Sequence, residues 1–231
     1  MDEDGIRALL KAARAGTLGE RVDRASAALL GQPYAVQPLG GGPGQPEVLS
    51  ASLDGFDCVT YLETVLAAAR ARTVEAFLAT LRRLRYRRGR VGWSTRHHYM
   101  TDWARENAAR GAVRDLTRGR GTVVRRRRLS VPGIAGKATR FRCFPKRRLP
   151  RGAAATGDLV LFASTRPDLD VFHVGLLVRR DGELRLRHAP RSRGRVVDQP
   201  LAAFLAAERM SGVILLRPRE GRPSSRRTAP R

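Results

Sequence analysis

The chain has 231 residues, of which 42% are hydrophobic and 29% charged, and this suits a globular protein with one sizeable core. Its formal net charge of +24 favours anionic partners such as nucleic acid, an anionic polymer or carboxylate-rich substrates. The acidic start lacks the apolar run of a signal peptide, and no stretch approaches the roughly 18 apolar residues of a membrane span. We therefore expect a globular enzyme or binding domain without a membrane span.

The chain has two cysteines, Cys58 and Cys143, which are too few for a disulfide framework or a cysteine-rich zinc site. It also has no Cys-x-x-Cys or His-Glu-x-x-His spacing. The sequence therefore predicts no metal and no cofactor.

The first part of the chain predicts helices followed by a loop. One or two helices are expected over residues 5–30, and Gly31-Gln32-Pro33-Tyr34 ends them. Residues 39–46, Leu-Gly-Gly-Gly-Pro-Gly-Gln-Pro, cannot form regular structure. Because this loop closely precedes Cys58, we expect it to form a wall of the cleft there.

Cys58 begins the next predicted helix. Either Asp54 or Asp57 can cap it, and the apolar residues that follow keep helical spacing: Leu62, Val65, Leu66 and Ala69. A thiol at a helix N-terminus lies at the positive end of the helix dipole, which favours the thiolate. Cys58 is therefore a candidate nucleophile, and a small buried hydrophobic residue is the alternative.

Two more helices are predicted before residue 112. Thr73 is the expected N-cap of the first, whose core-facing stripe is Val74, Phe77, Leu78 and Leu81. The second runs from His98 or Tyr99 to Gly111, with Trp103 in the core. The cluster Arg96-His97-His98-Tyr99 is unusual for buried positions.

The remaining elements are mostly strands. Residues 112–150 are basic and irregular apart from short strands at 122–129 and 139–144, in which Cys143 is expected to be half-buried. Further strands are expected at 159–162, 171–179, 183–189 and 213–216, with a helix at 201–208. We expect one domain over residues 1–216 with a basic helical and irregular insertion at about 70–150, and a disordered basic tail over 217–231.

A hairpin brings two histidines together. Asp181-Gly182 is a strong two-residue turn signal, and this turn places His188 opposite Gly175. Opposed residues share a face of the sheet, and so do residues two apart on one strand. His173, two residues before Gly175, therefore lies on the same face as His188. The two histidines become a diagonal cross-strand pair with backbones about 7–8 Å apart.

Two histidines on one sheet face suit nucleophilic catalysis when a cysteine lies over them. His173 would be the general base, and His188 would fix its orientation and tautomer. One alternative is that the two histidines lie on their strands without a shared role. The other is a metal site, but no third histidine or carboxylate stands at matching spacing.

The motifs come in a specific order: Cys58 in Phe-Asp-Cys-Val-Thr-Tyr-Leu-Glu, His173 in Phe-His-Val-Gly and His188 in Arg-His-Ala, with Gly-Gln-Pro-Tyr at 31–34 and Gly-Asp-Leu-Val at 157–160. Over residues 25 to 216 this order resembles the NlpC-type papain-like cell-wall peptidases and amidases. Arg96-x-His98-Tyr99 with Asp102-Trp103, and the long spacing from Cys58 to His173, resemble the N-acetylmuramoyl-L-alanine amidase-like branch.

The resemblance implies an α+β, papain-like NlpC-type fold, with N-terminal helices and the nucleophile helix packed on a central antiparallel sheet. It implies a cysteine hydrolase of peptidoglycan or muropeptides that cuts between N-acetylmuramic acid and L-alanine. Cleavage between D-glutamate and diaminopimelate is the alternative. Cys58, His173 and His188 would be catalytic, with the Cys58 N–H as oxyanion donor. Substrate-binding roles are expected for Tyr34, Asp57, Trp93, Arg96, His98 and Tyr99.

Several features depart from the family pattern. Pro190 and Arg191 stand where small hydroxyl residues often follow the second histidine. The family implies the cell envelope, whereas the absence of a visible signal peptide leaves the cytoplasm open. The charge also allows a basic nucleic-acid-binding domain, but scattered arginines without a stacking or helix-turn-helix motif argue against specific nucleic acid binding. An anionic polymer is a candidate partner of the basic surface, and a catalytically dead envelope-binding domain is a third alternative.

Overall fold

The computed structural model describes residues 2–220. The helices are α1 Glu3–Ala12, α2 Leu18–Ala28, α3 Cys58–Arg70, α4 Val74–Arg85, α5 Met100–Ala109 and α6 Leu201–Ala207, with short 3-10 helices η1 Arg87–Gly89, η2 Trp93–Thr95, η3 Lys146–Arg148 and η4 Arg191–Arg193. The strands are β1 Val113–Asp115, β2 Val123–Val131, β3 Ile134–Cys143, β4 Leu159–Ala163, β5 Val171–Arg180, β6 Glu183–His188, β7 Val197–Pro200 and β8 Gly212–Pro218. The predicted α+β class is confirmed.

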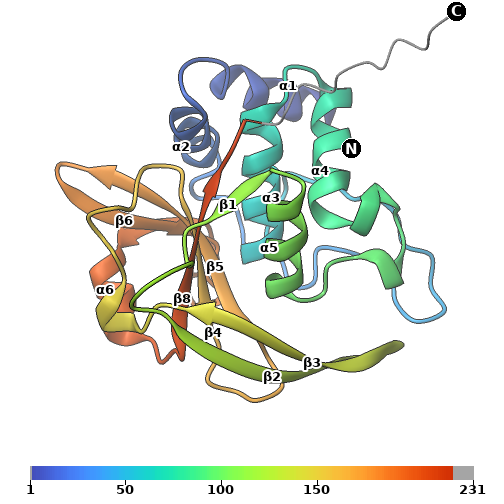
Figure 1. The fold of residues 1–231 in the computed structure, drawn as a ribbon. Helices are drawn as coiled ribbons and strands as arrows, with labels where there is room; N and C mark the ends of the chain where they lie inside the picture. The colour runs from blue at the N-terminus through green and yellow to red at the C-terminus, as the bar shows by residue number, and fades with distance from the viewer. Residues whose placement is uncertain (1, 221–231) are drawn as a thin grey trace, which may run out of the picture.

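The main sheet has six strands in the order β1-β8-β4-β5-β6-β7, and each neighbouring pair is antiparallel. Helices α1 to α5 gather on one side of this sheet and α6 lies on the other (Figure 1). β2 and β3 form a separate two-stranded ribbon, which runs below α5 in the view of Figure 1. The sheet that we expected at the centre of the fold is therefore present.

The central strands separate two hydrophobic cores. Leu159 and Leu161 of β4 pack with the large helical layer, whereas Val160 and Phe162 pack with Phe204 of α6. Successive side chains of a strand point to opposite faces, so a continuous apolar run fits a strand that is covered on both sides. This alternation places the face of β5 that carries His173 towards α6, because His173 pairs with Phe162.

The β5–β6 hairpin has the predicted register. Leu176 pairs with Arg187, and Arg180 pairs with Glu183. The turn residues Asp181 and Gly182 have φ values of 48° and 77°, as a type I′ turn requires at both central positions. The register therefore brings His188 beside Gly175, as the sequence predicted.

α3 begins at Cys58 because Asp57 caps it. The Asp57 Oδ1 accepts the backbone N–H groups of Val59 and Thr60 at 3.0 and 2.7 Å. In return, the Thr60 hydroxyl accepts the Asp57 N–H at 3.0 Å. Of the two candidate caps, Asp57 is thus the one used, and the reciprocal bonds fix where the helix starts.

A buried ion pair ties α3 to its neighbours. Glu63 of α3, which is 1% exposed, accepts Arg85 Nε of α4 at 2.7 Å and Trp103 Nε1 of α5 at 3.0 Å. A buried carboxylate is costly unless it is paired and hydrogen-bonded, so these partners hold the three helices in one arrangement. Trp103 lies in the core as expected.

Several boundaries differ from the sequence expectations. β8 extends to Pro218 because Arg217 and Pro218 pair with β1, so the predicted tail over 217–231 begins within a strand. Residues 221–231 lie outside the described part of the chain. Cys143 is fully buried rather than half-buried, because its sulfur lies against Gly212, where no side chain intervenes.

The ribbon and the sheet edges also differ from expectation. β2 and β3 are longer than predicted and pair with each other from Val123–Cys143 to Val131–Ile134. The edge strands β1 and β7 were not predicted and have three and four residues. None of the helices within residues 2–220 combines the length and the apolar character needed to cross a bilayer.

We predict that Gly175→Ala destabilises the fold and disturbs the site. The added Cβ would lie 2.6 Å from Leu186 Cδ1 and 3.1 Å from His188 Cβ, and overpacking of this kind costs about 1–3 kcal/mol. Urea unfolding measures the loss. Gly152→Ala is the matched control, because a Cβ there meets nothing within 4 Å; equal midpoints for the two variants would contradict the close approach.

Candidate active site

The Cys58 side chain lies where α3 meets β5. Its thiol lies close enough to the backbone N–H groups of Val174, the residue after His173, and of Cys58 and Val59 for them to lower its pKa. Within residues 2–220, no backbone carbonyl accepts the Cys58 N–H. The start of α3 therefore offers a half-buried cysteine residue and a backbone N–H group that forms no hydrogen bond to a backbone carbonyl.

Burial, together with the neighbouring carboxylate of Asp57, keeps this thiol protonated. Burial raises the pKa of Cys58 to about 12, and the carboxylate of Asp57 contributes to the increase. The three backbone N–H groups oppose these effects, because they stabilise the thiolate. The helix start alone therefore does not produce the thiolate that the sequence pattern favoured.

His173 and His188 are in direct contact. The Nε2 of His173 lies 2.5 Å from the Nδ1 of His188, and their ring centroids are 4.8 Å apart at an interplanar angle of 76°. The predicted diagonal pair is therefore present in the structure. Because Nε2 of His173 is taken by this bond, Nδ1 is the nitrogen that remains for proton transfer.

An aromatic wall surrounds the pair. The His173 ring stacks on Phe162 at 6.2 Å and lies 5.6 Å from Phe204, whose ring also meets His188 edge-on at 5.3 Å. Burial lowers the pKa of His173 to about 3, with a further contribution from His188. Burial and the positive charge of Arg193 lower the pKa of His188 to about 4. Both imidazoles are thus neutral near neutral pH.

Gln199 extends the pair into a chain of three side chains. Its amide nitrogen lies 3.0 Å from Nε2 of His188. An amide has an oxygen and an NH₂ of similar shape, so the hydrogen-bond network decides which one faces the ring. Sequence reasoning missed Gln199, because nothing in the local pattern of β7 distinguishes this residue from an ordinary polar strand residue.

Cys58 and His173 come from elements that contact each other, α3 and β5, but the two side chains are not hydrogen-bonded. Among the hydrogen bonds of residues 2–220, none joins the Cys58 sulfur to His173, whose Nε2 faces His188 instead. In a resting enzyme such bonds are often long and tighten when substrate binds. The structure therefore pairs His173 with His188 and places Cys58 near the backbone of the residue that follows His173.

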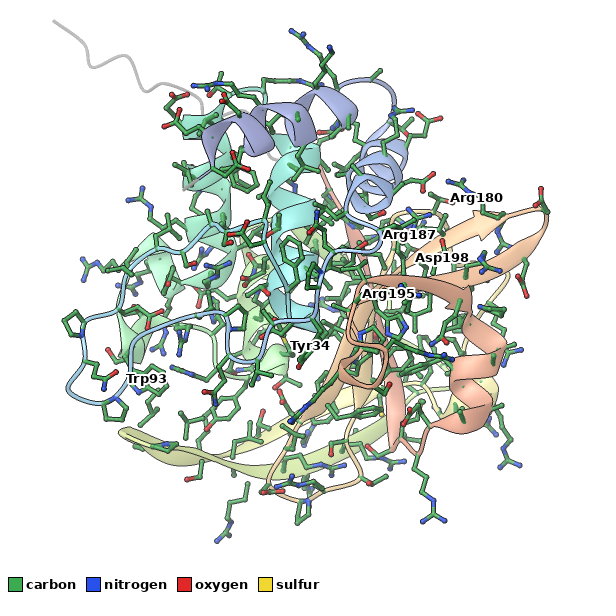
Figure 2. All side chains as sticks on the ribbon, turned by 180° about the vertical axis from the view of Figure 1, so that it is seen from behind. Tyr34, Trp93, Arg180, Arg187, Arg195 and Asp198 are labelled. Atoms are coloured by element: carbon green, nitrogen blue, oxygen red, sulfur yellow. The ribbon has the colours of Figure 1, made fainter. Side chains whose placement is uncertain are left out.

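Three of the predicted substrate-binding residues line one cavity. A cavity of about 310 Å³ is bordered by Asp57, Trp93 and Arg96, together with Leu39 and Gly41. The glycine-rich loop is therefore a wall beside the start of α3, as expected. Trp93 lies away from Tyr34 towards the β2–β3 ribbon in Figure 2.

Arg96 is held in place by contacts that the sequence did not reveal. Its guanidinium lies 4.5 Å from the Trp93 ring centre and donates to Glu47 Oε1 at 2.9 Å. Glu47 also accepts the Tyr86 hydroxyl at 2.8 Å. Because Glu47 is distant in sequence and stands alone in an irregular segment, no motif could identify it as the partner.

His98 and Tyr99 line a neighbouring cavity of about 560 Å³, which also borders Arg96. His98 Nε2 lies 2.7 Å from the Trp93 carbonyl oxygen, and the two rings meet at 4.4 Å. Tyr99 is 7% exposed, and its hydroxyl has no hydrogen-bond partner within the described residues. The structure thus brings His98 to Trp93, whereas Tyr99 lines a different cavity from Asp57.

Tyr34 lies next to the start of α3. Its backbone forms an isolated parallel β-bridge with Phe56, the residue before Asp57. Its N–H donates to the Gly194 carbonyl at 2.8 Å. In Figure 2, Tyr34 lies between Trp93 and Arg195. Burial raises the pKa of the Tyr34 hydroxyl, the charges of Cys58 and Asp57 raise it further, and the charge of Arg191 lowers it. The hydroxyl is therefore within electrostatic reach of the thiol.

A third cavity, of about 430 Å³, borders both histidines and Gln199. Asp57 and Val59, which flank Cys58, line the first cavity, whereas His173 lines this one. Cys58 itself lines neither cavity and adjoins the first through its two neighbours. Within residues 2–220, no group of three or more His, Cys, Asp or Glu side chains is arranged to bind a metal ion.

Comparison with known proteins identifies related sequences and structures. A model of the AmiA-like family, described as N-acetylmuramoyl-L-alanine amidase-like, matches residues 24–213. The fold is similar to that of a Legionella pneumophila protein, with 21% identity, a TM-score of 0.81 and coverage of 96% of this chain and 95% of that chain. It is also similar to an N-acetylmuramoyl-L-alanine amidase from Bacteroides uniformis, with 26% identity, a TM-score of 0.77 and coverage of 88% and 100%. No curated protein sequence matches the chain.

We predict that the rate of alkylation of Cys58 by iodoacetamide rises steadily from pH 6 to pH 10. The thiolate reacts, and a thiol whose pKa is raised to about 12 gains thiolate with each step in pH. Peptide mapping by mass spectrometry measures the rate at Cys58 alone.

Asp57→Asn provides the matched comparison. Asparagine keeps the cap but removes the negative charge, so the thiol pKa falls and alkylation becomes faster at any given pH. A plateau in the wild-type rate below pH 7 would instead indicate a thiolate–imidazolium pair and contradict the neutral resting state.

Proposed function

This chain belongs to the AmiA-like family of N-acetylmuramoyl-L-alanine amidase-like proteins, and we propose that it is a cysteine hydrolase of peptidoglycan or muropeptides with an NlpC-type, papain-like site. The bond that it cuts joins N-acetylmuramic acid to L-alanine. The observation that carries the proposal is the 2.5 Å contact between His173 and His188, beside a cysteine at a helix N-terminus.

Cys58 is the nucleophile in this mechanism. As its sulfur attacks the amide carbonyl carbon, Nδ1 of neutral His173 takes the thiol proton. The free N–H of Cys58 points from the helix start and donates to the developing oxyanion. His173 then gives the proton to the leaving nitrogen, the C–N bond breaks, and a thioester remains on Cys58.

Water completes the reaction. His173, neutral again, takes a proton from water as the oxygen attacks the thioester carbonyl carbon. The sulfur leaves as a thiolate and regains a proton from His173. The low pKa of His173, about 3, means that the base is unprotonated at neutral pH, so the resting pair needs no prior loss of a proton.

His188 and Gln199 select the tautomer of the base. His173 can accept a proton at Nδ1 only if its other hydrogen is on Nε2, which then donates to Nδ1 of His188. His188 must in turn carry its hydrogen on Nε2 and donate it to the side-chain oxygen of Gln199. The opposite amide orientation, with the Gln199 NH₂ facing the ring, would reverse both hydrogen bonds and leave His173 Nδ1 without a lone pair for the thiol.

The two cavities suit the two halves of the substrate. The leaving nitrogen must lie near His173, so the peptide occupies the cavity that contains the histidines. The acyl half, which carries the sugar, then extends past Asp57 to Trp93 and Arg96. An aromatic face with a fixed guanidinium and carboxylate is well suited to hold a sugar through stacking and hydrogen bonds.

A peptidoglycan substrate also suggests the cell envelope as the place of action. The alternative bond within the same family resemblance, between D-glutamate and diaminopimelate, uses the same nucleophile and base and differs in the products. Product masses therefore decide between these two reactions.

We predict that Cys58→Ala abolishes release of L-alanine-containing peptide from muropeptides, with a loss of at least about 1,000-fold, because removal of a nucleophile eliminates the covalent route. Liquid chromatography with mass spectrometry measures the released peptide. Cys143→Ala is the matched control and keeps most of the activity, since Cys143 is buried against Gly212, away from the histidines. Equal activity of wild type and Cys58→Ala would refute the proposal.

We predict that Gln199→Leu lowers kcat about 10- to 100-fold with little change in KM, because it removes the acceptor that holds the useful tautomer. Gln199→Glu, which always presents an oxygen, keeps more activity than Gln199→Leu. Steady-state kinetics measures the difference. The prediction fails if the two variants have the same kcat, because a purely structural role would not depend on the acceptor oxygen.

A further inference from the structure

The cavity that contains the two histidines is lined by two arginines that no part of the mechanism uses. Its volume is about 430 Å³, and Arg191 and Arg193 line it together with Phe172 and Phe204. The cavity therefore combines an apolar wall with two positive charges at the side of the base from which the leaving group departs.

The backbone of these arginines is held at both ends. Arg193 N–H donates to the Pro190 carbonyl at 3.1 Å, and the following Gly194 has a left-handed φ of 62°. On the far side, the Gly194 carbonyl accepts the Tyr34 N–H at 2.8 Å, and Val196 N–H donates to the Gln32 carbonyl, also at 2.8 Å. The loop from His188 to Val196 thus presents its arginines from a fixed position.

Both guanidinium groups are available to a ligand. Within residues 2–220, the side chains of Arg191 and Arg193 form neither a hydrogen bond nor an ion pair. Arg187, on the preceding strand, is by contrast paired with Asp23 and Asp198 at 2.9 Å. Arg191 is also close enough to Tyr34 for its positive charge to lower the pKa of the Tyr34 hydroxyl.

We propose that Arg191 and Arg193 form a carboxylate-binding subsite for an acidic peptide on the leaving-group side of the scissile bond. The inference rests on the proposed function, which places the departing amine beside His173. Guanidinium groups bind carboxylates through paired, charge-assisted hydrogen bonds. A stem peptide carries free carboxylates within a few residues of that amine.

The composition of the cavity favours a peptide over a polyphosphate. Glu208 is the one acidic side chain that lines it. It would repel a multiply charged phosphate, whereas it can accept an ammonium group of an amino acid that also carries carboxylates. The enzyme therefore distinguishes substrates with free carboxylates from those in which the carboxylates are amidated.

Binding and turnover together test the subsite. The probe is the tripeptide L-alanyl-γ-D-glutamyl-diaminopimelate, compared with the same peptide amidated at all its carboxylates, and calorimetry measures its dissociation constant for Cys58→Ala enzyme. We expect the acidic peptide to bind at least about tenfold more tightly than the amidated one. Arg191→Gln with Arg193→Gln should remove this preference, and lysine at both positions should restore part of it.

Arg195→Gln is the matched control, because Arg195 is in the same loop and exposed but does not line the cavity. It should leave the preference unchanged. Absence of peptide binding, or equal binding of the acidic and amidated peptides, would overturn the subsite. Turnover of muropeptides is measured separately with enzyme that retains Cys58. A failure of the proposed reaction is thereby distinguished from a failure of the subsite.

Discussion

The site depends on the register of one β-hairpin. With a two-residue turn at Asp181-Gly182, His188 lies beside Gly175, and His173 comes within 2.5 Å of it. A slip of one residue would move one ring to the opposite face of the sheet. Gly175 is part of the same constraint, since a side chain there would occupy the space of Leu186 and His188.

Burial is the second constraint, and it acts on both partners in the proposed proton transfer. It lowers the pKa of His173 and raises that of Cys58, so the resting pair is neutral. Asp57 both starts the helix and opposes the thiolate. Capping uses its Oδ1 for two backbone N–H groups and the Thr60 hydroxyl, and its charge still raises the thiol pKa. The nucleophile must then be generated during attack rather than stored.

Much of the site could be predicted from local sequence. The cap before Cys58, the two-residue turn and the alternation on β5 and β6 each follow from interactions between near neighbours, and their combination gave the histidine pair. The edge strands of the main sheet could not be predicted from local sequence in the same way. β1 and β7 have only three and four residues, too short for a pattern, and tertiary pairing selects them.

Long-range partners are the other part that the sequence did not reveal. Glu47 holds Arg96, and Gln199 completes the histidine chain, but each is a single polar residue in a segment with no motif. Tyr99 shows the reverse case. Its place in a recognisable cluster suggested substrate binding, yet it is only 7% exposed and lines a different cavity from Asp57.

The most direct test of the nucleophile and of the bond is the mass of the covalent intermediate. Enzyme mixed with a muropeptide and quenched in acid within milliseconds can be analysed by intact-mass spectrometry and peptide mapping. We predict a mass increase equal to the N-acetylmuramoyl acyl group, located on Cys58 as a thioester. An increase equal to N-acetylmuramoyl-L-alanyl-γ-D-glutamyl, or an adduct on a residue other than Cys58, would contradict the proposed reaction.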